Sequence, residues 1–237
     1  SHTVQKDLME FMGEHIGEPA RGKYYDHFLL GADFNAKSKN LAPVRDELAS
    51  VFKARPTYLI VSTIEPRKNH SYLLNTLDIL WRDDIDVGLV IVGRTGWKVE
   101  HITQRIYNHP EYHNKLFHWD NLDDTELEYC YKHAKALLFP SIVEGFGLPI
   151  VESLTHGLPV LASDTPIHRE IGADRIDYFS LNNPHDLARQ IKQIEAHGFP
   201  AHLQHIKHYS WMNWNESSQM LLDKIINVPL QTETLKN

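Results

Sequence analysis

From residue 57 onward, short apolar runs alternate with longer amphipathic segments. TYLIVST (57–63) and VGLVIVG (87–93) are rich in β-branched residues and predict buried strands, while SYLLNTLDILW (71–81) has its apolar residues at helical spacing. Strands that alternate with helices of this length are joined by βαβ crossovers. The pattern therefore predicts an α/β fold over about 57–200, with a single parallel sheet and helices on both of its faces.

The alternation continues as far as residue 198. Further strands are predicted at 116–119, 136–140, 159–163 and, as a short edge strand, 177–181. Further helices are predicted over 98–108, 123–134 and 184–198. The last of these has Pro184 near its first turn and Gly198 past its end, which are typical positions for these residues.

The two ends of the chain do not follow this pattern. Residues 1–17 predict a helix, 25–34 a strand and turn, and 35–56 a polar linker with a short helix. The tail, 210–225, predicts an amphipathic helix whose apolar face must pack on something. That face includes Trp211, Trp214, Leu221 and Ile225.

Since only one sheet is predicted, these flanks are interpreted as parts of a partner domain that the chain lacks. The predicted organisation has three parts: the tail of that domain with a linker (1–43), a domain that holds the predicted sheet (44–209), and a C-terminal helix and tail (210–237).

Composition narrows the class of protein. The 237 residues carry a net charge of −7, which gives no general reason to bind nucleic acid. A single cysteine, Cys130, excludes an internal disulfide and fits a reducing compartment. No apolar run approaches the roughly 18 residues of a membrane span, and no signal peptide is recognisable. We expect a cytoplasmic protein, with peripheral attachment to the inner face of a membrane left open.

The stretch FPSIVEGFGLPIVES combines a strand end, a glycine turn and a helix start. Gly145 and Gly147 let the backbone approach a ligand with no Cβ in the way. The N–H groups at the start of the following helix favour a bound phosphate. Glu144 and Glu152 flank this turn. Because carboxylates repel phosphate, they are better suited to accept hydrogen bonds from the hydroxyl groups of a sugar attached to it.

A second candidate lies in IEPRKN (64–69), the loop after the first strand of the sheet. Arg67 and Lys68 can reach the same sheet edge as the glycine turn. An arginine can bind a phosphate through two parallel hydrogen bonds, and a lysine adds a compact charge. Two such cations would stabilise the charge that develops when a diphosphate leaves. The alternative is an ordinary exposed basic pair in a turn.

Two further residues follow strand ends but carry weaker signals. In VGRTGW (92–97), the glycine turn is not a complete dinucleotide fingerprint, and Arg94 either serves a diphosphate or lies on the surface. In SDTPIHREIG (163–172), a structural or surface role is favoured over catalysis for His168.

The sequence gives little reason to expect a metal. His202, His205 and His208 lie three residues apart, near one face of a helix. Good zinc sites usually add carboxylate or thiolate ligands, so a solvated helical face is the favoured interpretation. Arg67 and Lys68 already supply positive charge, and no acidic metal triad accompanies them. We expect neither a divalent metal nor another cofactor.

Taken together, four segments resemble retaining GT-B glycosyltransferases of family 4, especially bacterial surface-polysaccharide mannosyltransferase-like members. The matching segments occur in the family's order and are VSTIEPRKNHSYLL, LVIVGRTGW, LFPSIVEGFGLPIVES and GLPVLASDTPIHREIG. The resemblance extends to YSWMNW (209–214), which is similar to the start of the helix that crosses back to the other domain. SHTVQKDL and LLGADF resemble the end of the family's N-terminal domain. The fold implied is the C-terminal, Rossmann-like half of GT-B.

The resemblance also implies a role for each matching residue. Glu144 would hold hydroxyls of the donor sugar, and Glu152 those of the ribose. Arg67 and Lys68 would bind the diphosphate, and Arg94 is a further candidate.

Backbone groups and one short segment complete the implied site. The diphosphate would also contact the glycine turn and the helix start, at Gly145, Phe146, Gly147 and Leu148. The nucleobase would lie along FHWDNL, where the candidate contacts are Phe117, His118 and Leu122. Trp119 stands where many family members have glycine.

The activity implied is transfer of a hexose with retention of configuration, in polysaccharide or O-antigen biosynthesis. GDP-mannose is the first choice of donor, and a UDP-sugar is the other. A glycan or lipid-linked glycan acceptor would bind through the N-terminal domain that family members carry and this chain lacks. The chain alone is therefore expected to bind a nucleotide sugar but to transfer sugar poorly.

Other classes of function stay in view. Two carboxylates also occur in glycosidases, but the neighbouring cations and helix start favour a phosphate leaving group. A nucleotide-dependent dehydrogenase would be expected to carry a complete glycine fingerprint and an acidic residue about 20 positions later. This combination is not found in the sequence. A non-catalytic binding or assembly module predicts no affinity for nucleotide sugars.

Overall fold

The computed structural model describes residues 1–17, 23–32, 43–204, 206 and 209–227. These residues form two compact units. One, the terminal unit, combines 1–32 with 211–227, and the other, the sheet domain, comprises 43–210. No described helix has the length and apolar character needed to cross a membrane.

The described strands of the sheet domain form one wholly parallel six-stranded sheet in the order β3-β2-β1-β4-β5-β6. Its strands are β1 (Thr57–Val61), β2 (Gly88–Val92), β3 (Leu116–Trp119), β4 (Leu137–Phe139), β5 (Val160–Ser163) and β6 (Asp177–Phe179). Leu59 of β1 pairs with Val90 of β2 on one side and with Leu137 of β4 on the other. β1 therefore lies in the middle of the sheet, and β6 lies at an edge as predicted.

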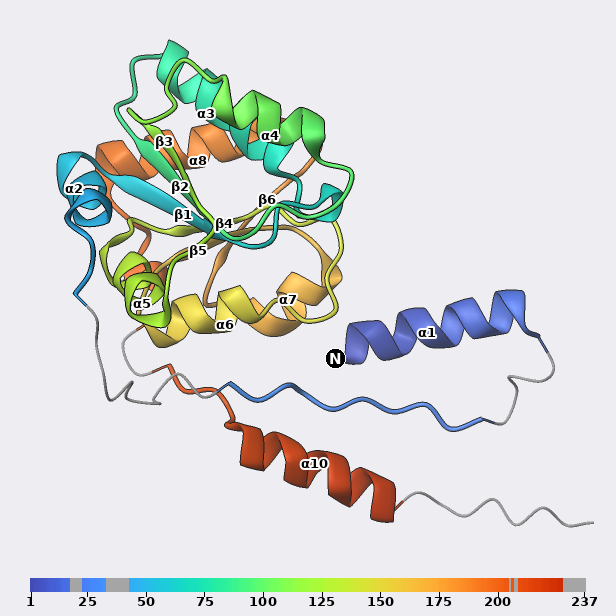
Figure 1. The fold of residues 1–237 in the computed structure, drawn as a ribbon. Helices are drawn as coiled ribbons and strands as arrows, with labels where there is room; N and C mark the ends of the chain where they lie inside the picture. Colours follow the sequence, from blue (N-terminus) through green and yellow to red (C-terminus); the bar gives the residue numbers. More distant parts are fainter. Residues whose placement is uncertain (18–22, 33–42, 205, 207–208, 228–237) are drawn as a thin grey trace, which may run out of the picture. The chain divides into compact units, whose positions relative to one another are not determined.

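Helices cover both faces of this sheet (Figure 1). One face is covered by α3 (His70–Arg82), α4 (Glu100–Tyr107) and α8 (Pro184–His197), and the other by α5 (Asp124–His133), α6 (Leu148–Thr155) and α7 (Pro166–Gly172). The domain also includes α2 (Asp46–Ala54), the 3-10 turn η2 (Pro66–Lys68) and α9 (Ala201–Gln204). The predicted parallel sheet between two layers of helices is confirmed.

The strands form where the sequence is apolar on both faces. All residues of β2, β4 and β5 are buried, because helices cover the sheet on each side. Helix boundaries follow their capping groups. Asp123 and Glu126 close a capping box at the start of α5, and α8 begins after Asn183, whose side chain accepts from the His185 N–H, and ends before Gly198. The predicted elements thus recur with ends shifted by a few residues.

The terminal unit contains α1 (His2–His15), the segment 23–32 and α10 (Trp214–Ile226). The strand predicted over 25–34 is wrong for the described residues 25–32, which belong to no strand. Side chains, rather than a neighbouring strand, bond several of its carbonyl groups: Gln5 donates to Tyr25 O, Trp211 to Leu30 O and Ser217 to Leu29 O. Residues 33–34 of this prediction, and 35–42 of the predicted linker, lie outside the described residues.

The C-terminal helix is confirmed but starts later than predicted. Asn213 accepts a hydrogen bond from the Glu216 N–H, and the Glu216 carboxylate accepts one from the Asn213 N–H. This capping box makes Trp214 the first helical residue, so Trp211 precedes the helix instead of belonging to its apolar face.

Candidate functional site

The order of the strands creates a crevice beside β1. From β1 the chain runs through β2 to β3 on one side, and then returns to β4 on the other side of β1. The loops after β1 (62–69) and β4 (140–147) therefore leave the sheet at a switch point, which is where ligands bind in open parallel sheets. A hydrogen bond of 2.8 Å from the Ile142 N–H to Arg67 O joins the two loops.

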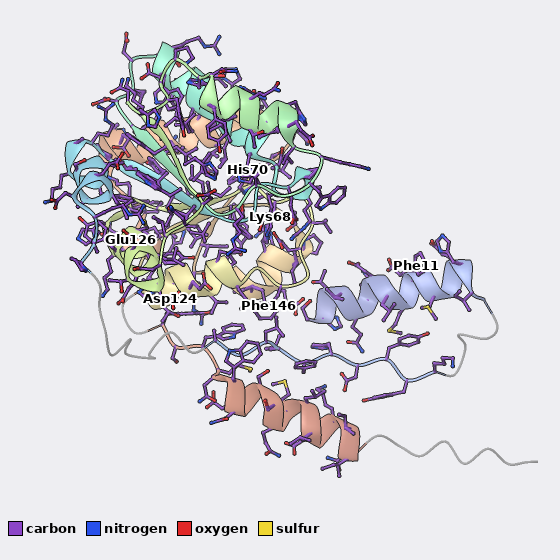
Figure 2. The ribbon with its side chains drawn as sticks, viewed as in Figure 1. Phe11, Lys68, His70, Asp124, Glu126 and Phe146 are labelled. Carbon is purple, nitrogen blue, oxygen red and sulfur yellow. The ribbon has the colours of Figure 1, made fainter. Side chains whose placement is uncertain are left out.

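These two loops bring three charged side chains together, and we call them the charged site. Lys68 Nζ lies 2.5 Å from Glu144 Oε1, and Arg67 Nη1 lies 2.8 Å from Glu144 Oε2. The Lys68 and Glu144 side chains are 9% and 7% exposed, whereas that of Arg67 is 43% exposed. Figure 2 shows Lys68 in its place at the end of the sheet. The alternative of an ordinary exposed basic pair thus fails to describe Lys68.

The charges of the site keep Glu144 ionised. Burial acts to raise the pKa of this carboxyl, but the hydrogen bond and charge of Lys68, with the charge of Arg67, outweigh it and lower the pKa overall. Glu65 binds Arg67 Nε at 2.9 Å from the other side. A buried, ionised carboxylate held by a lysine is a strong acceptor for hydroxyl groups.

The glycine turn stands at the start of α6, next to the charged site. Gly147 caps the helix with φ +99°, a conformation that residues with a Cβ rarely adopt. A Cβ at Gly145 would meet no other atom within 4 Å, so the space beside it is open. The first N–H groups of a helix have no acceptor within the helix, which makes this start suitable for an anion.

Glu152 lies one turn further along α6. Its Oε2 accepts a hydrogen bond of 2.5 Å from the hydroxyl of Tyr131, a buried residue of α5. Burial raises the pKa of Glu152, and the hydrogen bond from Tyr131 counteracts this in part. Its Oε1 makes no hydrogen bond with the described residues, so one carboxylate oxygen can accept from a ligand.

A cavity of about 500 Å³ lies at the carboxyl ends of the strands, the same edge of the sheet as the charged site, and we call it the strand-end cavity. Its walls are the ends of β1 and β2 and the loop 120–123, which follows β3. Of the predicted nucleotide-binding residues, Arg94 and Leu122 line it. The Arg94 side chain is exposed and forms no hydrogen bond or ion pair with the described residues.

Phe117 and His118 do not line this cavity. The Phe117 ring stacks on that of Trp119, with centroids 5.5 Å apart. His118 uses both ring nitrogens within the protein, because Nε2 lies 2.8 Å from Gly93 O and Nδ1 lies 3.0 Å from the Tyr107 hydroxyl. The structure therefore gives His118 a role in holding the end of β2.

Sequence reasoning missed several residues of the site. Ser62 and Thr63 line the cavity directly after β1, a position that could have marked them, whereas Asn121, which also lines it, lies within the segment FHWDNL expected at the nucleobase. Tyr131 carries no local signal, since it meets Glu152 only through the packing of α5 against α6.

Two of the histidines singled out in the sequence, His168 and His202, have partners within the protein. His168 is fully buried, and its Nδ1 lies 2.8 Å from Ser163 O. His202 Nε2 lies 2.8 Å from Asp177 Oδ1, while His205 and His208 lie outside the described residues. Among the residues that the structure describes, no group of three or more His, Cys, Asp or Glu is arranged to hold a metal ion.

The family described as glycosyl transferases group 1 matches residues 47–210. The chain belongs to this family. Among curated proteins, the serotype-specific mannosyltransferase WbdA of Escherichia coli is 33% identical over 230 residues, which cover 95% of this chain and 28% of WbdA. The O-antigen chain mannosyltransferase RfbU of Salmonella typhimurium is 30% identical over 139 residues, covering 58% of this chain and 38% of RfbU. The chain thus spans little more than a quarter of the length of WbdA.

Solved structures show the same fold at low sequence identity. The N-terminal domain of Candida albicans trehalose-6-phosphate phosphatase has a TM-score of 0.75 at 15% identity, covering 95% of this chain and 57% of that one. Anabaena Alr3699/HepE, solved in complex with UDP and glucose, has a TM-score of 0.69 at 14% identity, with coverages of 96% and 68%. The C-terminal domain of a group 1 glycosyl transferase, LpcC of Francisella tularensis, has a TM-score of 0.56 at 13% identity, and this chain covers all of it with 84% of its own length.

Proposed function

We propose that this chain is the donor-binding domain of a retaining mannosyltransferase and that its donor is GDP-mannose. The observation that carries the proposal is the meeting of Arg67, Lys68 and Glu144 at the switch point of the sheet. Membership of the group 1 family and similarity to two mannosyltransferases, WbdA and RfbU, support it. A UDP-sugar is the alternative donor.

In this proposal the diphosphate lies at the start of α6. The backbone N–H groups of 146–148 donate to its oxygens, and the exposed guanidinium of Arg67 binds it from the opposite loop. The nucleoside extends into the strand-end cavity. Glu152 accepts a hydrogen bond from a ribose hydroxyl through its Oε1, the carboxylate oxygen that Tyr131 does not occupy.

The charged site has two tasks in the transfer reaction. When the bond from the sugar C1 to the diphosphate oxygen breaks, negative charge grows on that oxygen, and Arg67 and Lys68 stabilise it. Glu144 accepts hydrogen bonds from hydroxyls of the sugar and so fixes the ring above the diphosphate. Lys68 serves both groups, because its hydrogen bond keeps Glu144 ionised.

We propose that the acceptor is bound by sequence outside these 237 residues. Because the chain spans 28% of WbdA, we propose that it binds donor, and that further sequence of the kind found in such relatives binds a glycan or lipid-linked glycan. By itself the chain is then expected to show no robust acceptor-dependent turnover. Transfer by the 237-residue chain at the rate of a complete enzyme would contradict this division.

Calorimetric titration tests the proposal directly. The chain should bind GDP-mannose more tightly than UDP-glucose and should not bind NAD. Arg67→Ala should weaken binding of GDP-mannose at least about tenfold, since it removes a charge-assisted hydrogen bond to phosphate. Arg189→Ala is the matched control, because Arg189 forms an exposed pair with Asp186 on α8. A chain that binds none of the three compounds would refute the proposed function.

A further inference from the structure

Arg45, which lies outside the sheet, forms an ion pair with Glu126 through two hydrogen bonds. It directly precedes α2, and its Nε and Nη2 lie 2.5 and 2.7 Å from the two carboxylate oxygens of Glu126. The Glu126 side chain is 5% exposed, and that of Arg45 is 38% exposed. Such a planar, two-bond pair fixes the direction of both side chains. Figure 2 shows Glu126 on α5.

Glu126 is also the third residue of α5 and takes part in its N-terminal cap. Its N–H donates to Asp123 Oδ1 at 2.9 Å, and its own Oε2 accepts from the Asp123 N–H at 3.4 Å. The carboxylate that Arg45 binds is therefore one half of the capping box. Through this carboxylate, Arg45 fixes the C-terminal end of the loop 120–123.

Arg45 contacts the middle of the same loop as well. Its Nη1 lies 3.3 Å from Asn121 Oδ1, and its Nη2 lies 3.5 Å from Asn121 O. Asp120 and Asn121 are exposed, and within the described residues the hydrogen bonds to Asn121 come from Arg45. All four residues of this loop line the strand-end cavity, whereas Arg45 does not.

We infer that Arg45 is a positioning residue for nucleoside binding: by holding Glu126 and Asn121 it fixes the loop that forms one wall of the strand-end cavity. The inference rests on the proposed function, which places the nucleoside in that cavity. It assigns Arg45 no contact with the ligand. Its loss should weaken binding of the nucleoside part while leaving the diphosphate part unaffected, because the diphosphate lies against other loops.

Two probes, GDP and inorganic pyrophosphate, separate these effects in calorimetric titrations of the 237-residue chain. Arg45→Ala should weaken GDP about tenfold, which corresponds to about 1.4 kcal/mol, and change pyrophosphate affinity less than about twofold. Arg45→Lys should lie in between, because lysine keeps the charge but cannot form two parallel bonds. Equal weakening of both probes, or unchanged GDP affinity, would overturn the role of Arg45.

A double variant guards against loss of folding. Arg45→Ala alone leaves the Glu126 charge buried without its partner, whereas glutamine at 126 can still close a capping box. Arg45→Ala with Glu126→Gln should therefore stay folded and still bind GDP about tenfold more weakly. Arg55→Ala is the control, because Arg55 flanks the other end of α2 and pairs with Asp86, away from the cavity.

Hydrogen exchange gives a readout that needs no ligand. The amides of 120–123 should exchange faster in the double variant than in the unaltered chain, with no change in the Arg55→Ala control. Unchanged exchange in this loop would refute the inference about Arg45. Absence of GDP binding by the unaltered chain would instead refute the proposed function, so the two failures are distinguishable.

Discussion

The charged site and the strand-end cavity share one edge of the sheet but are built in opposite ways. Lys68 and Glu144 are almost fully buried and satisfy each other's charge at 2.5 Å. The cavity is open, and its polar residues Arg94, Asp120 and Asn121 are exposed. One region is thus organised before any ligand arrives, while the other depends on a short loop that Arg45 holds from outside. Under the proposed function, affinity for phosphate is therefore built into the core of the domain, whereas the choice of nucleoside depends on peripheral contacts.

The largest change in stability is expected when the buried pair of Lys68 and Glu144 is broken. Lys68→Met leaves the Glu144 carboxylate buried with its nearest partner gone, so we expect the free energy of unfolding to fall by about 3 kcal/mol or more. Urea unfolding followed by circular dichroism measures the change. Lys132→Met is the control: Lys132 pairs with Glu128 on the exposed face of α5, and its loss should cost less than about 1 kcal/mol.

The double variant Lys68→Met with Glu144→Leu sharpens the same test. Replacing both members of a buried pair by apolar side chains commonly restores stability. We expect stability near that of the unaltered chain, without measurable binding of GDP-mannose. Recovery of donor binding along with stability would mean that the charged site has no role in recognition.

A somewhat smaller change in stability is expected from the titration of His70, the first residue of α3, which directly follows the loop 62–69. It is buried, its Nε2 lies 3.4 Å from Ser62 Oγ at the cavity, and burial, with smaller contributions from His118 and Lys68, lowers its pKa to about 4. An unfolded histidine titrates near pH 6.5, so between about pH 6.5 and 4 the unfolded chain binds a proton that the folded chain does not. The stability that comes from keeping His70 neutral is therefore fully present above about pH 6.5. As the pH falls from there to about 4, the free energy of unfolding should decrease by about 3 kcal/mol.

Urea unfolding at intervals from pH 7 to pH 4.5 measures this loss. His70→Gln has no group that titrates in the window, so its stability should fall less steeply with decreasing pH than that of the unaltered chain. Identical slopes for the two proteins would show that His70 is not the source.

The smallest changes are expected from substitutions of the two glycines of the turn. Substitution of Gly147 should lower stability, whereas substitution of Gly145 should lower ligand affinity. Gly147→Ala forces a Cβ onto a residue at φ +99° and should cost about 1–2 kcal/mol of stability. Gly145→Ala places its Cβ in open space, so stability should change by less than about 0.5 kcal/mol while GDP-mannose affinity falls. Thermal unfolding and calorimetric titration of both variants measure the two quantities. Unchanged affinity in Gly145→Ala would mean that the ligand does not approach this turn.

Local structure could be predicted from the sequence where both partners of an interaction lie in one short segment. The strand end, the glycine turn and Gly147 as helix cap all lie within a few residues, so turn and helix could be predicted together. Periodicity likewise predicted the alternating strands and helices of the sheet domain. The loops after β1 and β4 could be placed at one edge because parallel strands share a direction.

Interactions between distant segments could not be predicted in this way. Arg45 and Glu126 are 81 residues apart, and no local pattern connects them. His118 was assigned to the nucleobase, and its ring binds Gly93 O, which directly follows a neighbouring strand and is 25 residues away. The segment 25–32 has the composition of a strand, but no described strand lies beside it. Which side chains face the cavity depends on such pairings. The roles of the individual site residues, and the domain limits, stay predictions.

The central position of β1 has a consequence for how the domain assembles. Lys68 and Glu144 are 76 residues apart in the chain and meet only after β4 has paired with β1, which requires β2, β3 and their crossover helices to be accommodated first. Closing so long a loop is slow and entropically costly. The crevice proposed to bind the diphosphate should thus be among the last features to appear during refolding, so that acquisition of nucleotide affinity over time would report completion of the sheet.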